Sequence, residues 1–311
     1  MADFVPHFGW QRDPEGTAAF VASLPRPRLA QAGPGLTLDR NLPVFLGHHL
    51  LRVMPDWKRG NQPIGSCTGW GASHVADTTA ACDILIRKER EGWGGRTIEG
   101  VTYGFSRVEV RGNKPNYGGD GSTGWGVAQA LTKFGTLQYG RNYNGKVYLP
   151  GEVSGNQERE WGRSGIPESL QQIAASHKFD DCTKVESFEE AATLIQNGYA
   201  VMVASDEGWD MTLDHGWCQG RDNWPHLMAF TGVVWDKDRG PGLYCQNSWG
   251  DCYRGTYDET LPVQFRRSGC YVPEKRVDRM LTCWDGDSFS VAGFNGFQPN
   301  PMAGTWTGGV L

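Results

Sequence analysis

The spacing of apolar and polar residues divides the chain into a helical first half and a β-rich second half. Over residues 68–91, apolar or small side chains recur at helical intervals, and three basic residues fall in the last turns, where the helix dipole favours cations. This pattern predicts a long amphipathic helix. Shorter helices are expected over 103–110, after Ser122, over 167–176, from Ser187 and over 273–281.

Strand patterns dominate after residue 198. Residues 199–204 form an apolar run, and 226–235 and 243–250 predict a hairpin with its turn near 238–242. Cys270–Val272 and residues 288–291 are two further strand candidates, whereas 136–165 and 206–224 are expected to be loops. This order predicts an α+β fold with a helical N-terminal lobe, an antiparallel sheet or barrel in the C-terminal lobe, and a cleft between them.

Proline and glycine mark the expected domain limits. Prolines at 25, 27, 34 and 43 interrupt the start of the chain, so residues 1–53 are expected to form an extended arm, which is a candidate contact for an assembly partner. Residues 54–294 are expected to form the main domain, and residues 295–311 an irregular tail.

Composition narrows the function classes. The net charge is −5 with no block of like charge, so nothing favours a nucleic acid or an anionic membrane as partner. No apolar run approaches the roughly 18 residues of a membrane span, and the N-terminus lacks the pattern of a signal peptide. An intracellular or virion-associated protein is therefore the expectation. The 8 cysteines contain no CxxC pair, which favours free thiols over a disulfide framework, and His215, Cys218, Cys245 and Cys252 match no compact zinc pattern.

One cysteine stands apart from the other seven. Cys67 follows a glycine-bearing loop and opens the first long helix, where unpaired N–H groups and the positive end of the dipole favour a thiolate. Loop amides could also bind a developing oxyanion. A buried structural cysteine in a turn is the alternative interpretation.

Two residues of the second half would complete a nucleophilic site. His226 begins one strand of the predicted hairpin, and Asn247 lies 21 residues later at the end of the other, so the two side chains can meet at one end. A histidine can accept the thiol proton and later protonate the leaving amine, while an asparagine oxygen orients its ring. Trp249 could shield that hydrogen bond from water.

Taken together, these motifs resemble the papain-like cysteine peptidases over residues 54–291. The residues that carry the resemblance are the Gly65-Ser66-Cys67 loop with Asn61 and Gln62 before it, Gly118-Gly119, His226, Asn247-Ser248-Trp249-Gly250 and the stretch Met54–Trp57. The resemblance implies that Cys67 is the nucleophile, His226 the acid and base, and Asn247 the residue that orients it. It also implies that the Cys67 N–H and a side-chain amide bind the oxyanion, and that Gly118, Gly119 and Pro225 contact a peptide substrate. No cofactor or metal is expected.

The sequence departs from the family pattern in several places. The oxyanion glutamine of the family lies six residues before the cysteine, where this chain has Asn61, whereas Gln62 lies five before it. Thr68 replaces an aromatic residue, Pro225 precedes the histidine, and no inhibitory pro-domain is recognisable.

The expected function is hydrolysis of peptide bonds through a cysteine acyl-enzyme, with a polypeptide as substrate. A papain-like fold that acts as a largely non-catalytic structural or binding module, for example in a virion, is the alternative. An isopeptidase or peptidoglycan amidase would use the same chemistry on another amide.

Overall fold

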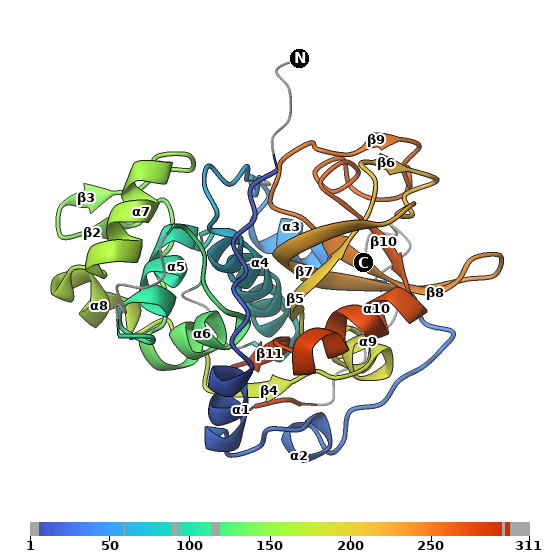
Figure 1. Cartoon of the computed structure of the whole chain (residues 1–311), viewed down its shortest axis with the longest axis horizontal. Helices are drawn as coiled ribbons and strands as arrows, with labels where there is room; N and C mark the ends of the chain where they lie inside the picture. The colour runs from blue at the N-terminus through green and yellow to red at the C-terminus, as the bar shows by residue number, and fades with distance from the viewer. Residues whose placement is uncertain are drawn as a thin grey trace.

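The chain folds into two lobes, one built mainly of helices and one around an antiparallel sheet. The computed structural model describes residues 6–58, 60–88, 93, 95–112, 119–293 and 296–298. In Figure 1 the helices between residues 99 and 174 gather on one side, and most strands after residue 200 lie on the other. This arrangement confirms the α+β prediction.

The sheet lobe contains seven strands in the order β10-β8-β7-β5-β11-β4, with β1 also paired to β7. Every pairing in this sheet is antiparallel, and its described strands form an open path without closure into a barrel. The strands are β1 (Val44–Phe45), β4 (Asp181–Lys184), β5 (Val201–Gly208), β7 (Asp222–Asp236), β8 (Gly240–Gln246), β10 (Gly269–Pro273) and β11 (Phe289–Ala292). The hairpin predicted from the apolar runs is β7–β8.

Two small sheets complete the strands. They pair β2 (Asn142–Tyr143) antiparallel with β3 (Lys146–Val147), and β6 (Thr212–Leu213) parallel with β9 (Arg254–Gly255).

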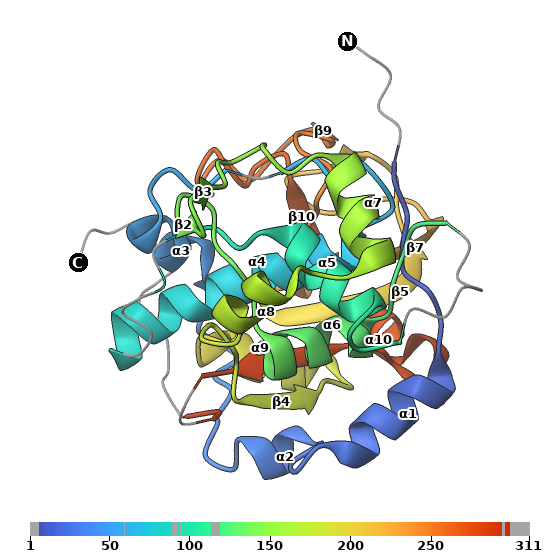
Figure 2. The ribbon, with the colours of Figure 1, turned by 90° about the vertical axis from the view of Figure 1, so that its left-hand side faces the viewer.

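The helical lobe surrounds the long helix that the sequence predicted after Cys67. Its helices are α4 (Cys67–Cys82), α5 (Glu99–Arg107), α6 (Gly124–Gln129), α7 (Gly155–Ser164) and α8 (Glu168–Ala174), and the π-helical turns η1 (Asp83–Arg87) and η2 (Ala130–Phe134) continue α4 and α6. Figure 2 shows α5, α7 and α8 in front of α4. Every residue of α4 is buried, because the helix packs against α5 on one side and β7 on the other.

Glycines in the first turn of α4 make this close packing possible. A Cβ on Gly69 would lie 2.6 Å from the Glu99 carbonyl oxygen of α5, and one on Gly71 would lie 2.4 Å from a side-chain carbon of Leu227 and 2.9 Å from its carbonyl oxygen in β7. The close approach expected from these glycines is therefore confirmed. It holds the start of α4 against the strand that carries His226.

The remaining helices lie at the N-terminus and against the sheet. They are α1 (Pro14–Ser23), α2 (Leu29–Ala32), α3 (Gly47–Val53), α9 (Phe188–Gln196), α10 (Glu274–Thr282) and the 3₁₀ turn η3 (Cys283–Asp285). Ser187 caps α9 by accepting from the Glu190 N–H, as its sequence predicts. Residues 6–53 are more regular than a continuous extended arm, since α1, α2, β1 and α3 interrupt them.

Both loop predictions are wrong in part, and residues 206–224 contain β6, the end of β5 and the start of β7. Residues 136–165 include the ten-residue helix α7, which starts at Ser154 with its side chain accepting from the Gln157 N–H. The spacing of Ser154 and Gln157 is typical of a capping box at the start of a helix. Few apolar residues follow it, so the sequence lacks the apolar periodicity from which the helix could have been predicted.

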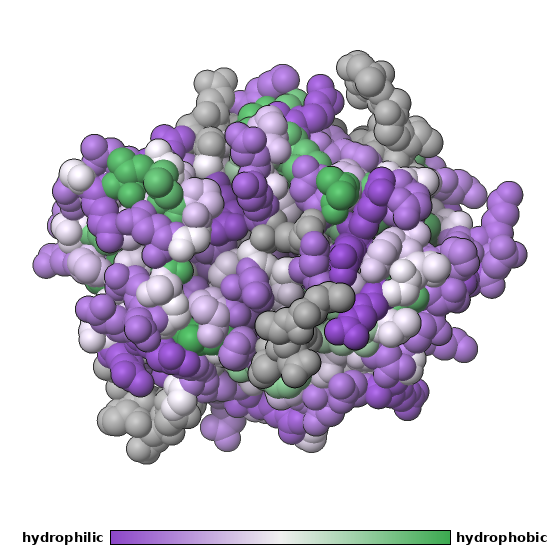
Figure 3. Space-filling model, turned by 90° about the horizontal axis from the view of Figure 1, so that it is seen from above, coloured by the Kyte–Doolittle hydropathy of each residue, from purple (hydrophilic) through white to green (hydrophobic). Residues whose placement is uncertain are grey.

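The surface seen from above is mainly hydrophilic, with scattered hydrophobic patches (Figure 3). In the described part of the chain, no helix is long and apolar enough to cross a membrane.

Candidate active site

Cys67 is the first residue of α4, and its side chain is completely buried. Backbone N–H groups of Leu227, Gly9 and Thr68 act to lower the pKa of its thiol and so favour the thiolate. Burial outweighs them and raises the pKa of the Cys67 thiol to about 12. The N–H groups at the helix start therefore act in the predicted direction, but removal of water disfavours the charged form more strongly.

His226 and Asn247 meet at the same end of the β7–β8 hairpin, as their spacing predicted. His226 Nε2 lies 3.0 Å from Asn247 Oδ1, and that oxygen also accepts from the Ser248 N–H at 2.7 Å. A backbone N–H can only donate, so the shared atom is the amide oxygen, and Nε2 must carry a proton to bond to it. In the neutral ring Nδ1 is then the basic nitrogen.

The surroundings of His226 keep its ring neutral and fixed. Burial lowers the pKa of His226 to about 4, against the opposing effect of its hydrogen bond to Asn247. Its Nδ1 is buried and has no hydrogen-bond partner among the described residues. The Trp249 ring lies over the imidazole, with centroids 4.4 Å apart, which is the shielding position expected for this tryptophan.

The two candidate oxyanion residues lie in different environments. Gln62 is buried, and its Nε2 donates at 2.9 Å to the carbonyl oxygens of both His7 and Ile64. Its Oε1 accepts from the Ser248 hydroxyl. Asn61 is exposed and contributes a backbone bridge to Trp249.

The candidate substrate-binding residues are only partly brought together. Gly118 lies outside the described residues. Gly119 has φ +93°, and its carbonyl accepts from Arg107. The Pro225 carbonyl and the backbone of Ser122 pair instead with the chain's own N-terminal segment. Sequence reasoning considered Ser122 only as a helix cap, a role that Thr123 takes for α6.

That N-terminal segment, residues 7–11, passes directly over the site. In Figure 1 it runs in dark blue down the line where the helical and sheet lobes meet. The Trp249 indole donates to the His7 carbonyl at 3.2 Å, and the Phe8 ring stands edge-on to the rings of His226 and Trp249. Nothing in the sequence of this segment signalled this position.

Glu158 is a buried carboxyl beside the nucleophile loop that sequence analysis missed. It projects from α7, and its two oxygens accept from the Ser66 hydroxyl at 2.5 Å and the Trp70 indole at 3.2 Å. Burial raises the pKa of Glu158 to about 8, with Glu99 and Asp120 acting in the same direction. A neutral carboxyl therefore ties α7 to the residue before Cys67.

Glu158 should make the protein less stable as pH rises. The folded chain keeps this proton up to about pH 8, whereas the unfolded chain loses it above about 4.5, so the stabilisation is complete below pH 4.5 and disappears through pH 8. Between pH 5 and 9 the wild type should lose about 2–4 kcal/mol of unfolding free energy relative to Glu158→Gln, whose amide can bond to both partners without ionising. Urea denaturation of both proteins at the two pH values measures this difference.

Glu160→Gln is the matched control, because Glu160 is exposed on the same helix. It should follow the wild-type pH dependence. Parallel wild-type and Glu158→Gln curves would contradict the assignment of a neutral Glu158.

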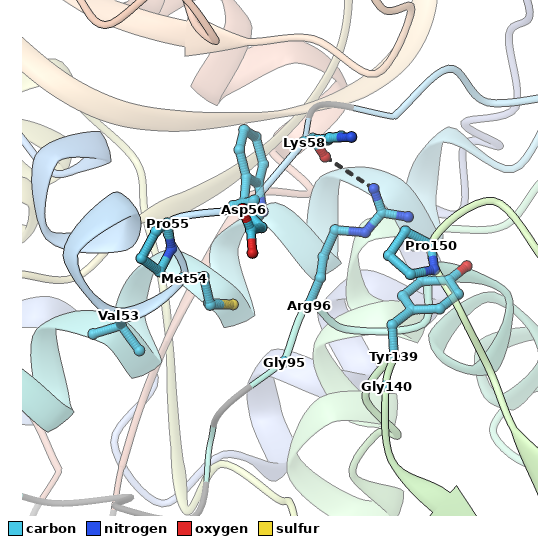
Figure 4. Close-up of a pocket in the computed structure, with 11 residues that line it drawn as sticks. Val53, Met54, Pro55, Asp56, Lys58, Gly95, Arg96, Tyr139, Gly140 and Pro150 are labelled. Carbon is cyan, nitrogen blue, oxygen red and sulfur yellow. Dashed lines mark hydrogen bonds between the residues drawn. The ribbon is translucent and has the colours of Figure 1, made fainter.

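A separate cavity of about 220 Å³ lies away from these residues. It is lined by Val53–Lys58, Gly95, Arg96, Tyr139, Gly140 and Pro150. In Figure 4 the Arg96 guanidinium reaches across it to the Lys58 carbonyl, at 2.9 Å. Cys67, His226 and Asn247 do not line it. Elsewhere in the described residues, no three metal-ligating side chains come together as a metal site.

Solved structures with the same fold are cysteine proteases. The chain matches xylellain, a cysteine protease from Xylella fastidiosa, with TM-score 0.54 and 12% identity, over 94% of this chain and 95% of that chain. It matches procathepsin B S9 from Trypanosoma congolense with TM-score 0.54 and 10% identity, over 92% and 86%. No protein-family model matches the sequence, and no curated protein matches it.

The fold is therefore that of the papain-like cysteine proteases, as the sequence resemblance predicted. At these identities the likeness concerns the fold alone.

Proposed function

We propose that the protein is a cysteine-type peptidase in which Cys67 attacks the carbonyl carbon of a peptide bond. The observation that carries this proposal is the hydrogen bond between His226 Nε2 and Asn247 Oδ1. Asn247 holds the Nε2–H form of the ring, so the basic atom is the buried Nδ1, which has no hydrogen-bond partner within the described part of the chain. The Leu227 N–H acts to lower the pKa of the Cys67 thiol, so the sulfur lies near the residue that follows His226.

The reaction follows from these positions. His226 Nδ1 takes the thiol proton as the Cys67 sulfur bonds to the substrate carbonyl, and the resulting imidazolium protonates the leaving amine. A water molecule then loses a proton to His226 and cleaves the thioester, which releases the acid and restores the thiol. Gln62 Nε2 and the Cys67 N–H stabilise the oxyanion in both steps.

Gln62 is the favoured oxyanion donor over Asn61. The Gln62 amide is buried and already holds a backbone carbonyl oxygen, that of His7, at 2.9 Å. The Asn61 side chain is exposed to solvent. The His7 carbonyl oxygen accepts a hydrogen bond from the Gln62 amide. In the proposed reaction the oxyanion of the substrate would accept the same hydrogen bond.

A peptide-library assay tests the proposal. The protein is incubated with a mixture of unstructured peptides, and new amino termini are identified by mass spectrometry. The assay uses the wild type and Gly9→Ala, because a Cβ on Gly9 would lie 1.8 Å from the Gly65 carbonyl oxygen and cannot coexist with residues 7–11 over the site. Cleavage is expected with Cys67 present and absent with Cys67→Ala. Equal product patterns with and without the thiol would rule out the peptidase function.

One observation favours the alternative of a non-catalytic module. Cys67 and His226 are both completely buried, and both are neutral at physiological pH. If Gly9→Ala exposes Cys67 to alkylation and yet cleaves no peptide, the fold serves binding rather than hydrolysis.

A further inference from the structure

We propose that Tyr253 positions Asn247, and through it the imidazole ring of His226, by accepting a hydrogen bond from the Asn247 amide nitrogen. Tyr253 is a positioning residue, because it acts on the reaction only through these two residues. The inference rests on the proposed function for its effect on kcat. Its effect on the imidazole ring does not depend on whether the protein cleaves peptides.

The Asn247 amide is bonded on both of its sides. Its Oδ1 accepts from the Ser248 N–H at 2.7 Å and lies 3.0 Å from His226 Nε2. Its Nδ2 donates to the Tyr253 hydroxyl oxygen at 3.2 Å. A half turn of the amide would bring Nδ2 towards the Ser248 N–H, and two donors cannot bond to each other. The two bonds together therefore keep the oxygen turned to the imidazole.

The Tyr253 hydroxyl is suited to this acceptor role. Asn247 Nδ2 and the Trp209 indole, which lies 3.0 Å from the same oxygen, can only donate, so the oxygen accepts from both. Burial raises the pKa of Tyr253 well above its ordinary value, so the hydroxyl stays neutral. Burial also raises the pKa of the Cys270 thiol and Tyr253 opposes that rise, so the Cys270 sulfur lies near the phenol proton.

The backbone of Tyr253 fixes the place of its hydroxyl. Tyr253 lies in the loop between β8 and β9, six residues after Asn247, and it is completely buried. Its N–H donates to the Arg267 carbonyl at 3.1 Å, and its carbonyl accepts from the Tyr257 hydroxyl at 3.2 Å. The acceptor that faces Asn247 is therefore held by both ends of its own peptide unit.

A second connection between Trp209 and His226 runs through packed aromatic rings. Trp249 lies over the His226 ring with centroids 4.4 Å apart. Trp224 packs against Trp249 at 5.0 Å, and Trp209 packs against Trp224 at 4.9 Å. The hydrogen bonds that begin at His226 Nε2 end at the same Trp209. Because both routes join the same two residues, the imidazole belongs to one closed and buried unit.

Tyr253→Phe keeps the ring and removes the acceptor. Asn247 Nδ2 and the Trp209 indole would both lose a partner where water does not reach, and a buried donor without a partner favours rotation of the amide. His226 Nε2–H then loses its fixed acceptor, and the tautomer with the proton on Nδ1 gains population. A ring protonated at Nδ1 cannot take the thiol proton in the proposed reaction.

Nitrogen NMR of the imidazole tests the proposal without any need for catalysis. The full-length wild type and Tyr253→Phe are labelled with ¹⁵N-histidine and compared at pH 7, where His226 is neutral because burial lowers its pKa to about 4. The chain has 7 histidines, and the His226 signals are those missing from His226→Gln. The wild type should show the Nε2–H form, and Tyr253→Phe a mixture that includes the Nδ1–H form.

Tyr244→Phe is the matched control. The Tyr244 ring is also buried, and its hydroxyl donates to the Phe265 carbonyl at 2.5 Å rather than to the Asn247 amide. This variant loses a buried hydroxyl of the same kind and should keep the wild-type tautomer. In the Gly9→Ala background, Tyr253→Phe should lower kcat about tenfold or more with KM within about twofold, and Tyr244→Phe should leave both near the parent values.

The outcomes separate this inference from the proposed function. A ring that stays fully Nε2–H in Tyr253→Phe, or that changes equally in Tyr244→Phe, would overturn the inference. A changed tautomer with unchanged kcat would keep Tyr253 as the positioning residue and reject Nδ1 as the base. If even the Gly9→Ala parent cleaves no peptide, the tautomer still decides whether Tyr253 positions His226.

A measurement on the wild type covers the case in which Tyr253→Phe does not fold. The Asn247 Nδ2 protons should show a nuclear Overhauser effect to the ring protons of Tyr253 and a weaker one to those of His226. The reverse pattern would place the amide nitrogen at the imidazole and overturn the inference.

Discussion

Gln62→Ala is expected to reduce kcat by about 10²–10³-fold, whereas Asn61→Ala should change it less than fivefold. The loss of one preorganised oxyanion donor has this magnitude in other enzymes, because the donor acts on the charge that develops in the transition state. Gln62 is buried with its amide on a carbonyl oxygen, and Asn61 is exposed. Peptide hydrolysis in the Gly9→Ala background measures both effects, since the His7 carbonyl no longer covers the amide.

Iodoacetamide labelling separates this role from a structural one. Gln62 also accepts from Ser248, so its removal could disturb the loop. Alkylation by iodoacetamide develops no carbonyl oxyanion, so Gln62→Ala should label at Cys67 as fast as its Gly9→Ala parent while hydrolysis falls. A parallel loss of labelling and hydrolysis would mean that Gln62 supports the thiol's position, and a larger loss with Asn61→Ala would reverse the assignment.

The parts of the fold that sequence predicted correctly depend on local signals. Ser187 and Glu190 lie three residues apart and indicate the start of α9. The glycines after Cys67 indicate that another segment packs closely against α4. The pairing of His226 with Asn247 could also be foreseen, because a hairpin joins the two strands and fixes which ends meet.

The parts that sequence did not predict depend on contacts between distant segments. Glu158 reaches Ser66 across 92 positions, and no periodicity in either segment encodes that meeting. The pKa of Cys67 could not be foreseen for the same reason. The dipole and N–H groups at the start of α4 were evident from sequence, but the complete burial that outweighs them arises only when the chain folds around the sulfur.

Asn247→Ala should reduce kcat about 10²-fold or more with little change in KM. Without the amide oxygen, His226 Nε2–H loses its acceptor at 3.0 Å, and nothing fixes Nδ1 as the basic nitrogen. Unlike Gln62→Ala, this change should also slow iodoacetamide labelling in the Gly9→Ala background, because formation of the thiolate depends on His226. Steady-state kinetics and labelling rates, measured on the same preparations, check both expectations.

Asn247→Asp separates orientation from packing. The carboxylate keeps an acceptor for Nε2–H, so part of the lost kcat should return. Its negative charge also stabilises the imidazolium and raises the pKa of His226. In the proposed reaction His226 must be neutral to take the thiol proton, and activity is lost as pH falls through its pKa, so the acid limb of the kcat/KM profile should move to higher pH. An unchanged limb, or full activity in Asn247→Ala, would show that Asn247 does not position His226.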